Sequence, residues 1–154
     1  MAIEIKGLDS LLKKLDSLNG NVKNAVYRGL EQVIEFADGE AKANKPYGSI
    51  MIQAETKMTA DGAEGKVFTN TPHAAYVEFG TGPKGQANHS GVSPKIPVTY
   101  TRHPWVYKSE DYGWVTTSGQ PAKPYLYPAA KATEPRVLQI MGNVFMQEIR
   151  RVGG

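Results

Sequence analysis

Apolar residues recur at helical spacing through the first third of the chain. Five leucines share one face of the segment 8–18, at positions 8, 11, 12, 15 and 18. This spacing predicts an amphipathic helix that ends at Asn19-Gly20. A second stripe, made by Val22, Val26, Val33, Ala37 and Ala41, predicts a helix over residues 21–43. Gly29 and Gly39 each weaken this helix by up to about 1 kcal/mol relative to alanine, and we expect them to mark close helix packing.

Residues 49–58 have a different period, because apolar and polar side chains alternate. Ile50, Ile52, Ala54, Thr56 and Met58 share one face, and Met51, Gln53, Glu55 and Lys57 share the other. The alternation predicts a half-buried strand. Turn-forming residues over 60–65 and a return segment over 66–70 predict that this strand belongs to a β-hairpin.

Three further elements are predicted in the second half of the chain. Pro72 and Gly80 suit the start and end of a short helix over residues 73–79, with a strand as the alternative. A turn at 109–111 joins the segments 105–107 and 114–117 in a second hairpin, which is aromatic. The last helix starts near Pro135, after a stiff, extended approach that contains Pro121, Pro124 and Pro128. Its predicted buried stripe is Leu138, Met141, Phe145, Ile149 and Val152.

These elements predict an α+β fold in a single domain over residues 1–154. We expect an antiparallel sheet of about four strands, packed largely on one face against N-terminal and C-terminal helices. Residues 81–119 form an extended arm, because the stretch 80–124 holds six of the ten prolines and both tryptophans. A loop of this length is usually functional or disordered, and its aromatic residues argue against disorder.

Charge and composition narrow the classes of function. The formal net charge is +3, and residues 80–124 alone carry +3. The two flanks cancel each other, since residues 1–79 carry −2 and residues 125–154 carry +2. The excess permits non-specific contact with DNA without requiring it. The absence of cysteine excludes disulfides, thiolate nucleophiles and cysteine-bound zinc. We expect no membrane span and no secretion signal, because no apolar run approaches about 20 residues and the first residues lack the signal pattern.

Motifs for catalysis or cofactor binding are weak. Residues 80–85 match the glycine pattern of a dinucleotide-binding loop, but such a loop needs a helix that starts at its third glycine. Pro83 lies inside the pattern, so we expect a glycine turn and no helix. His73, His89 and His103 lack metal-ligand spacing, and Ser49, Ser90 and Ser118 lack the nucleophile-elbow frame. We therefore expect no enzyme activity, no metal and no cofactor.

The arm mixes aromatic and basic side chains that suit two kinds of partner. Tyr100, Arg102, Trp105, Tyr107 and Trp114 could stack on single-stranded nucleic acid or pack on a neighbouring protein. The modest charge favours protein contact, and a non-sequence-specific nucleic-acid-binding module stays as the alternative.

Two runs of residues are distinctive: Pro72-His73-Ala74-Ala75-Tyr76-Val77-Glu78-Phe79-Gly80-Thr81-Gly82, and Gly119-Gln120-Pro121-Ala122-Lys123-Pro124-Tyr125-Leu126-Tyr127-Pro128-Ala129-Ala130. Together with the opening Ile5-Lys6-Gly7-Leu8-Asp9, they resemble the tail-component family of long-tailed bacteriophages, also called neck or tail-completion proteins. Tyr76, Glu78 and Phe79 of the first run join the candidate interface. For Glu78 we expect a solvated carboxylate, with Lys123 as the alternative, buried partner.

The resemblance implies a structural virion protein of the neck, made in the host bacterial cytoplasm. Its copies would form a homo-oligomeric ring around the DNA channel. The implied neighbours are a head-closure or connector protein on one side and a tail terminator or tail-tube protein on the other. The arm would reach a neighbouring subunit or ring.

Overall fold

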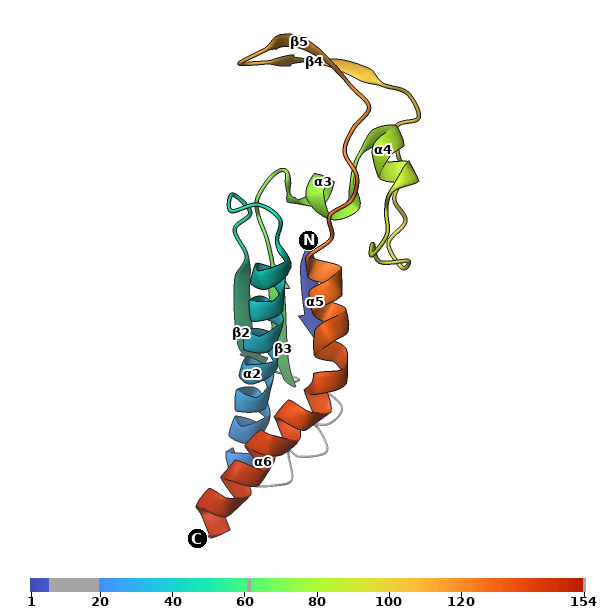
Figure 1. Ribbon diagram of the computed structural model, residues 1–154. Coiled ribbons are helices and arrows are strands. Elements are labelled where there is room, and N and C mark those ends of the chain that lie inside the picture. Colours follow the sequence, from blue (N-terminus) through green and yellow to red (C-terminus); the bar gives the residue numbers. More distant parts are fainter. Residues whose placement is uncertain (6–19, 61, 154) are drawn as a thin grey trace.

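The computed structural model describes residues 1–5, 20–60 and 62–153 (Figure 1). The elements are β1 (Ala2–Ile5), α2 (Gly20–Asn44), β2 (Gln53–Thr59), β3 (Gly62–Phe68), α3 (Ala74–Phe79), α4 (Gly82–Ala87), β4 (Trp105–Ser109), β5 (Gly113–Thr117), α5 (Leu126–Thr133), the 3₁₀ turn η1 (Glu134–Arg136) and α6 (Val137–Gly153). The helix predicted over residues 8–18 lies outside the described residues.

The α+β class is confirmed, but the strands do not form one sheet of four. The described residues form an antiparallel three-stranded sheet in the order β1-β3-β2, and a separate two-stranded hairpin of β4 and β5. The hairpin stands apart from the sheet, beyond α3 and α4 (Figure 1). It cannot extend the sheet because it is built into the arm, which leaves the body at the far end of the molecule from the C-terminus.

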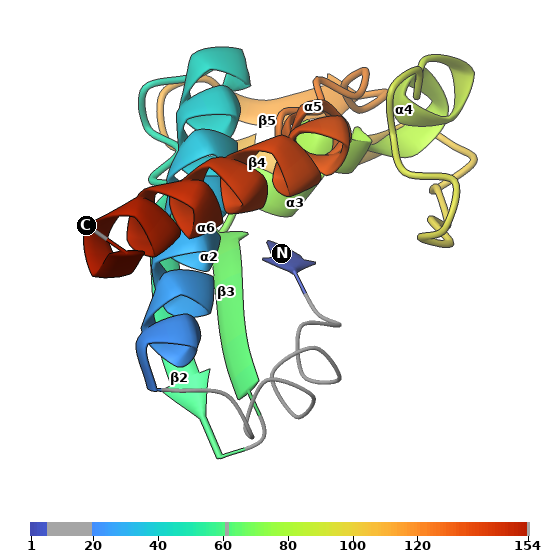
Figure 2. The same cartoon turned by 90° about the horizontal axis from the view of Figure 1, so that it is seen from below.

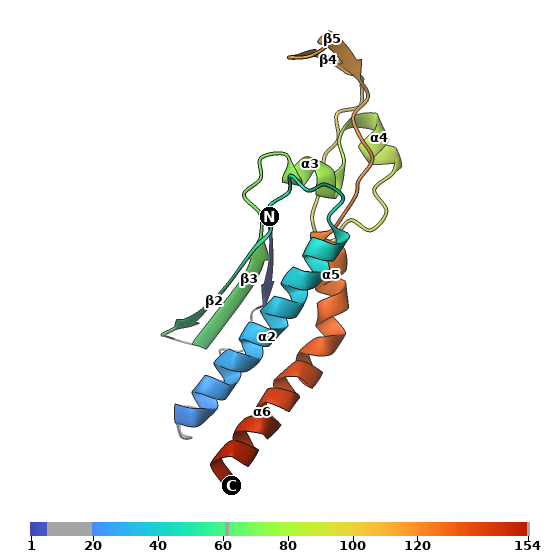
Figure 3. The same ribbon diagram turned by 60° about the vertical axis from the view of Figure 1, so that its left-hand side comes forward.

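Helix α2 is the centre of the body. Its buried stripe, which includes Val26, Leu30, Val33, Ala37 and Ala41, packs against β2 and β3 on one side. Helices α5 and α6 pack against its other side (Figure 3). Seen from below, α6 crosses over α2 (Figure 2). The helix predicted over 21–43 is thus confirmed, and it is the layer between the sheet and the C-terminal helices.

The first predicted hairpin is confirmed with different bounds. Strand β2 begins at Gln53, and Ile50 and Ile52 are buried in the loop that precedes it. Within β2 the predicted buried face is wrong in part, since Ala54 and Met58 are both exposed. Strand β3 begins at Gly62, earlier than predicted. Gly65, which was expected in the turn, belongs to the strand, and Ile34 of α2 packs closely against it.

The C-terminal helical segment begins at Leu126, well before the predicted start near Pro135. Pro128 is tolerated in the first turn of α5, where its missing N–H costs no helical bond, and Pro135 lies in the 3₁₀ turn between α5 and α6. Among the helices of the described ranges, none combines the length and hydropathy needed to cross a membrane.

The predicted buried stripe of α6 is wrong in part. Met141 and Val144 are buried, but Leu138 and Ile149 are 85% and 61% exposed. Helix α6 turns its Met141 side to α2, where a Cβ on Gly29 would lie 2.6 Å from the Met141 sulfur. Gly29 therefore marks close helix packing as predicted, whereas nothing lies within 4 Å of a Cβ on Gly39.

Two glycine-to-alanine substitutions should change stability in opposite directions. At Gly65 the new methyl group would collide with the buried Ile34 side chain, so we expect a loss of about 1–3 kcal/mol in the free energy of unfolding. At Gly39, in the open face of α2, alanine should add up to about 1 kcal/mol. Urea unfolding of both variants measures the two effects. A neutral Gly65→Ala would contradict the close approach of α2 and β3.

Candidate functional site

The two ends of the arm are joined to each other. Thr81 N–H donates to Gln120 O at 2.9 Å, and Gln120 N–H donates back to Thr81 O at 3.1 Å. The Gln120 side chain also donates to Tyr76 O of α3 at 2.9 Å, and Lys84 N–H donates to Ser118 O at 3.1 Å. The arm therefore leaves and re-enters the body at one hydrogen-bonded base.

Glu78 occupies a place that the sequence did not reveal. Its side chain is 2% exposed, and its carboxylate accepts hydrogen bonds from the backbone N–H groups of Tyr125 at 2.7 Å, Leu126 at 3.0 Å and Tyr127 at 2.9 Å. These groups belong to the N-terminus of α5, where backbone N–H groups lack helical partners and the helix dipole attracts a negative charge. Tyr125, at the N-cap, makes no side-chain cap of its own.

The expected solvated carboxylate is therefore wrong, and so is the alternative pairing with Lys123. The Lys123 side chain donates to the Tyr47 hydroxyl at 2.8 Å and lies 4.9 Å from the centre of that ring. The Lys123 backbone N–H donates to Val77 O at 2.8 Å, in the helix of Glu78. Because Glu78 is buried in its own chain, it is not accessible to an interface.

The two distinctive runs of the sequence meet at this point. The first run supplies α3 with Glu78 and the positive-φ Gly80 and Gly82, and the second supplies Gln120, Lys123 and the start of α5. Their contacts join the two ends of the arm to each other and to the start of α5. We call this hydrogen-bonded unit, residues 76–82 with 119–127, the clamp.

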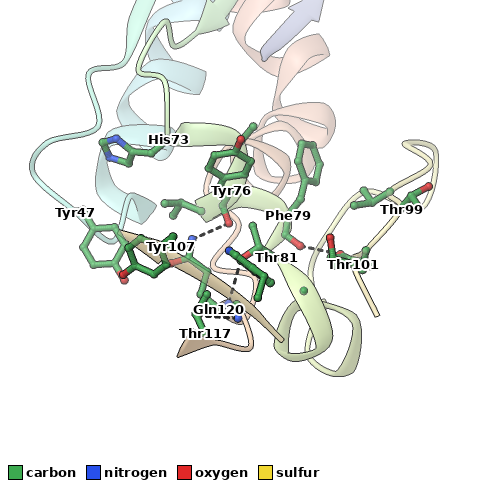
Figure 4. A pocket seen from close by; sticks show the side chains of 18 residues that line it. Tyr47, His73, Tyr76, Phe79, Thr81, Thr99, Thr101, Tyr107, Thr117 and Gln120 are labelled. Carbon is green, nitrogen blue, oxygen red and sulfur yellow. Dashed lines mark hydrogen bonds between the residues drawn. The ribbon is translucent and has the colours of Figure 1, made fainter. Parts of the chain in front are cut away.

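An open cleft of about 980 Å³ lies between the clamp and the hairpin (Figure 4). One side is formed by Tyr47, His73 and Tyr76, from the loop after α2 and from α3. The other side is formed by Trp105, Tyr107 and Thr117 of the hairpin. Phe79 and Tyr100 also line it. The lining contains no carboxylate, so the cleft is aromatic and free of negative charge.

The hairpin presents different side chains on its two faces. Trp105 lies opposite Thr117, and Tyr107 lies opposite Val115, so these four share the face that lines the cleft. Val106 lies opposite Thr116, and Lys108 lies opposite Trp114, so these share the other face. Trp114 is 74% exposed, and Tyr112 in the turn is 83% exposed. The predicted aromatic hairpin is confirmed, and aromatic groups stand on both faces and at the tip.

The structure separates the candidate interface residues into three groups. Five line the cleft: Tyr76, Phe79, Tyr100, Trp105 and Tyr107. Arg102 and Trp114 are exposed outside it, and Glu78 is buried in the clamp. Tyr100 also has a structural contact, because its hydroxyl donates to Phe79 O at 2.7 Å and its burial raises its pKa.

Tyr47 and His73 complete the cleft without having been predicted there. Tyr47 follows α2 and lies far from the arm in the sequence, so no spacing could connect the two. The short helix α4 is a correction as well, because the glycine pattern was expected to exclude a helix. Pro83 sits in the first turn of α4, where proline is favoured, and the helix ends at Ala87. It does not start at the third glycine, as a dinucleotide site requires.

The structure brings one serine and one histidine together. The Ser49 hydroxyl lies 3.3 Å from His73 Nε2. Within the described residues, no carboxylate bonds the other ring nitrogen of His73, and no three metal-ligating side chains cluster. All three histidines are exposed. A serine–histidine contact without an orienting third group falls short of a hydrolase triad.

Removing the Glu78 carboxylate should destabilise the protein strongly. Glu78→Ala leaves three N–H groups at the start of α5 without their acceptor in a buried place, so we expect a loss of about 2–4 kcal/mol in the free energy of unfolding. Glu110→Ala, an exposed carboxylate in the hairpin turn, is the matched control and should change stability by less than about 0.5 kcal/mol. Equal effects in thermal or urea unfolding would refute the role of the clamp.

Tyr125 should make stability depend on pH in the alkaline range. Burial and the neighbouring Glu78 charge raise its pKa to about 12 from 10.0. The folded state therefore favours the neutral phenol. The contribution of this preference to the free energy of unfolding is complete below pH 10 and is lost as the pH rises from 10 to 12. In the described residues its buried hydroxyl has no hydrogen-bond partner.

The variant Tyr125→Phe tests this. At pH 8 it should be neutral or more stable by about 1–2 kcal/mol, because it removes an unpaired buried hydroxyl. At pH 11 its advantage over the natural chain should grow, since phenylalanine cannot ionise. Urea unfolding at the two pH values measures the difference, which the other tyrosines do not affect because both chains share them. An advantage that stays constant with pH would refute the assignment.

Comparison with known proteins does not place the chain in a group. No protein-family model, no curated protein and no solved structure matches it. A proposal for the function therefore rests on two things: the geometry of the clamp, the hairpin and the cleft, and the resemblance carried by the two runs of sequence.

Proposed function

We propose that this protein is a structural subunit of the neck of a long-tailed bacteriophage, whose copies assemble into a ring that joins head to tail. The observation that supports an assembly role is the hairpin: it is held at a fixed place above the body, while its aromatic side chains remain exposed. The resemblance of the two runs of sequence supports the neck as the place of assembly.

The hairpin is poorly suited to stand in water alone. An isolated two-stranded hairpin is marginally stable, and stability normally needs a third strand or a packed face. Here Val106, Tyr107, Tyr112 and Trp114 are 56%, 46%, 83% and 74% exposed. Val106 and Trp114 share one face, and exposed apolar groups of this kind mark protein–protein contacts, with tyrosine and tryptophan enriched at their energetic centres. A partner protein that covers the hairpin would supply the missing packing.

The body is built to bear such a contact. The clamp ties the base of the arm to α5, and α5 continues into α6, which packs on α2. A contact made at the hairpin is therefore passed to the whole domain. When one surface of a subunit binds a different surface of the next, repeated copies close into a ring if the rotation permits. The head-closure or connector protein and the tail terminator or tail-tube protein are the neighbours of that ring.

The charge on the hairpin favours protein over nucleic acid as its partner. Between residues 101 and 119 there are two basic side chains, Arg102 and Lys108, and two acidic ones, Glu110 and Asp111. The positive excess of residues 80–124 comes from Lys84, Lys95 and Lys123, outside the hairpin. A binder of nucleic-acid backbone would need a positive excess where its aromatic groups project.

Removing the hairpin should abolish assembly without unfolding the domain. In the test variant, residues 104–118 are replaced by a short glycine–serine link, which keeps Thr81 and Gln120 paired. We expect the complete chain to form rings as its concentration rises, and the deletion variant to stay monomeric with its helices intact. Analytical ultracentrifugation, negative-stain images and circular dichroism measure these properties.

Two results would contradict the proposal. One is a deletion variant that assembles like the complete chain. The other is a complete chain that remains monomeric at every concentration and binds oligonucleotides with an affinity that falls steeply with salt, which would favour the nucleic-acid-binding alternative.

A further inference from the structure

We infer that the cleft of each copy receives the hairpin tip of the next copy, residues 109–114, with the neighbour's Tyr112 and Trp114 packed among the aromatic side chains of the cleft. This inference rests on the proposed function, because it requires that copies of the chain assemble. It names which two surfaces meet and in which direction the subunits follow one another.

The cleft has the size and lining to hold a segment of chain. Its volume of about 980 Å³ is at the upper end of the range of roughly 300–1,000 Å³ that is usual for sites that hold a ligand. Six aromatic side chains line it: Tyr47, Tyr76, Phe79, Tyr100, Trp105 and Tyr107. Its walls come from α3 and the loop after α2 on one side and from the hairpin on the other (Figure 4).

The hairpin tip has the complementary shape and chemistry. Tyr112 and Trp114 are among the most exposed large side chains of the described residues. Tyr112 lies in the three-residue turn between β4 and β5, and Trp114 lies in β5, two residues further on. Aromatic side chains favour contact with one another in offset or edge-to-face arrangements. Each would bury roughly 150–250 Å² in the cleft, a large share of the about 800 Å² per partner that a stable interface buries.

A chain cannot fill its own cleft with its own tip. Trp114 lies directly opposite Lys108, and Lys108 follows Tyr107 along β4. Successive residues of a strand point to opposite faces, so Trp114 faces away from the cleft that Tyr107 lines. The cleft and the tip are therefore complementary surfaces that only two different copies can bring together. When the second copy does not return the contact to the first, the contact is heterologous and leads to a ring or a filament.

Charge supports the same pairing. The tip carries Glu110 and Asp111, both exposed. The cleft lining carries no carboxylate, and the ammonium group of Lys123 lies beside its Tyr47 wall, 2.8 Å from the Tyr47 hydroxyl. An acidic turn that enters the cleft therefore meets a cation and no like charge. This favours entry with the carboxylates of the turn toward Lys123 and disfavours the opposite orientation of the tip.

Cysteine cross-linking between two single variants tests the contact. The natural chain has no cysteine, so each introduced thiol is unique. One variant carries Asp111→Cys at the tip, and the other carries Ala75→Cys, an exposed position in the cleft lining. The two are mixed while dilute, concentrated together and oxidised. We expect a disulfide-linked dimer from the mixture, and far less from either variant alone.

A matched control places the second thiol elsewhere on the body. Lys57→Cys, exposed on β2, should give no dimer with Asp111→Cys. Assembly without a cross-link between tip and cleft would overturn this inference and leave the proposed function standing, with another protein as the occupant of the cleft. A chain that never assembles would overturn both. A strong dimer from Asp111→Cys alone would also overturn the inference, because it indicates a symmetric tip-to-tip contact.

A second measurement uses the affinity between copies. The double variant Tyr112→Ala, Trp114→Ala should weaken association at least tenfold, as truncation at the centre of an interface usually does. Its thermal unfolding as a monomer should not change, because both side chains are exposed in the free chain. Leu138→Ala, an equally exposed apolar side chain on α6, is the control and should leave association unchanged. Equal effects of the two variants would refute the tip as the contact.

Discussion

The carboxylate of Glu78, buried between α3 and α5, is the interaction on which the arrangement of this protein depends. A helix that begins inside a protein leaves backbone N–H groups without partners, and burying them unpaired is costly. The N-terminus of α5 has no side-chain cap of its own, and Glu78, 47 residues earlier than Tyr125, supplies three hydrogen bonds there. Because a charged acceptor matches both the N–H groups and the helix dipole, one side chain joins the first half of the chain to the second.

The position of the arm follows from that bond. Once α3 is fixed to α5, the backbone contacts of Val77 with Lys123 and of Thr81 with Gln120 set the direction in which the arm leaves the body. The Tyr100 hydroxyl bonds Phe79 O and fixes the loop that leads to the hairpin. A surface that is already fixed before it binds loses less conformational freedom on binding. The hairpin is thus both uncovered and held in place, as expected of a surface prepared for a partner.

The body reaches its stability by other means. Helix α2 lies between the sheet and the C-terminal helices, and two glycines, Gly29 and Gly65, allow neighbouring layers to approach it closely. In the described residues this packing does not extend to the hairpin, whose Trp105 ring lies against Gly82 of α4. The chain therefore has a body whose apolar side chains pack against one another and an arm whose hairpin keeps apolar side chains exposed.

The sequence by itself determined the elements whose cause is local. The helix α2, the short helix α3 and the two hairpins follow from periodicity and from turn residues, because a strand or helix with one buried face repeats its apolar residues at a fixed spacing. Periodicity did not decide which face of α6 would be covered, since Met141 and Leu138 are both apolar and only the position of α2 distinguishes them. It also did not reveal where the C-terminal helices begin, because the cap of α5 comes from α3.

Only the tertiary structure decided the site. It buried Glu78, placed Lys123 beside Tyr47, and brought Tyr47, Tyr76, Tyr100 and Tyr107 around one cleft from four separate parts of the chain. The sequence indicated that aromatic residues of the arm would meet a protein, but not that the arm would stand over a cleft made by its own body. Such contacts join residues many positions apart, and no local spacing encodes them, because they depend on how the packed layers bring distant segments together.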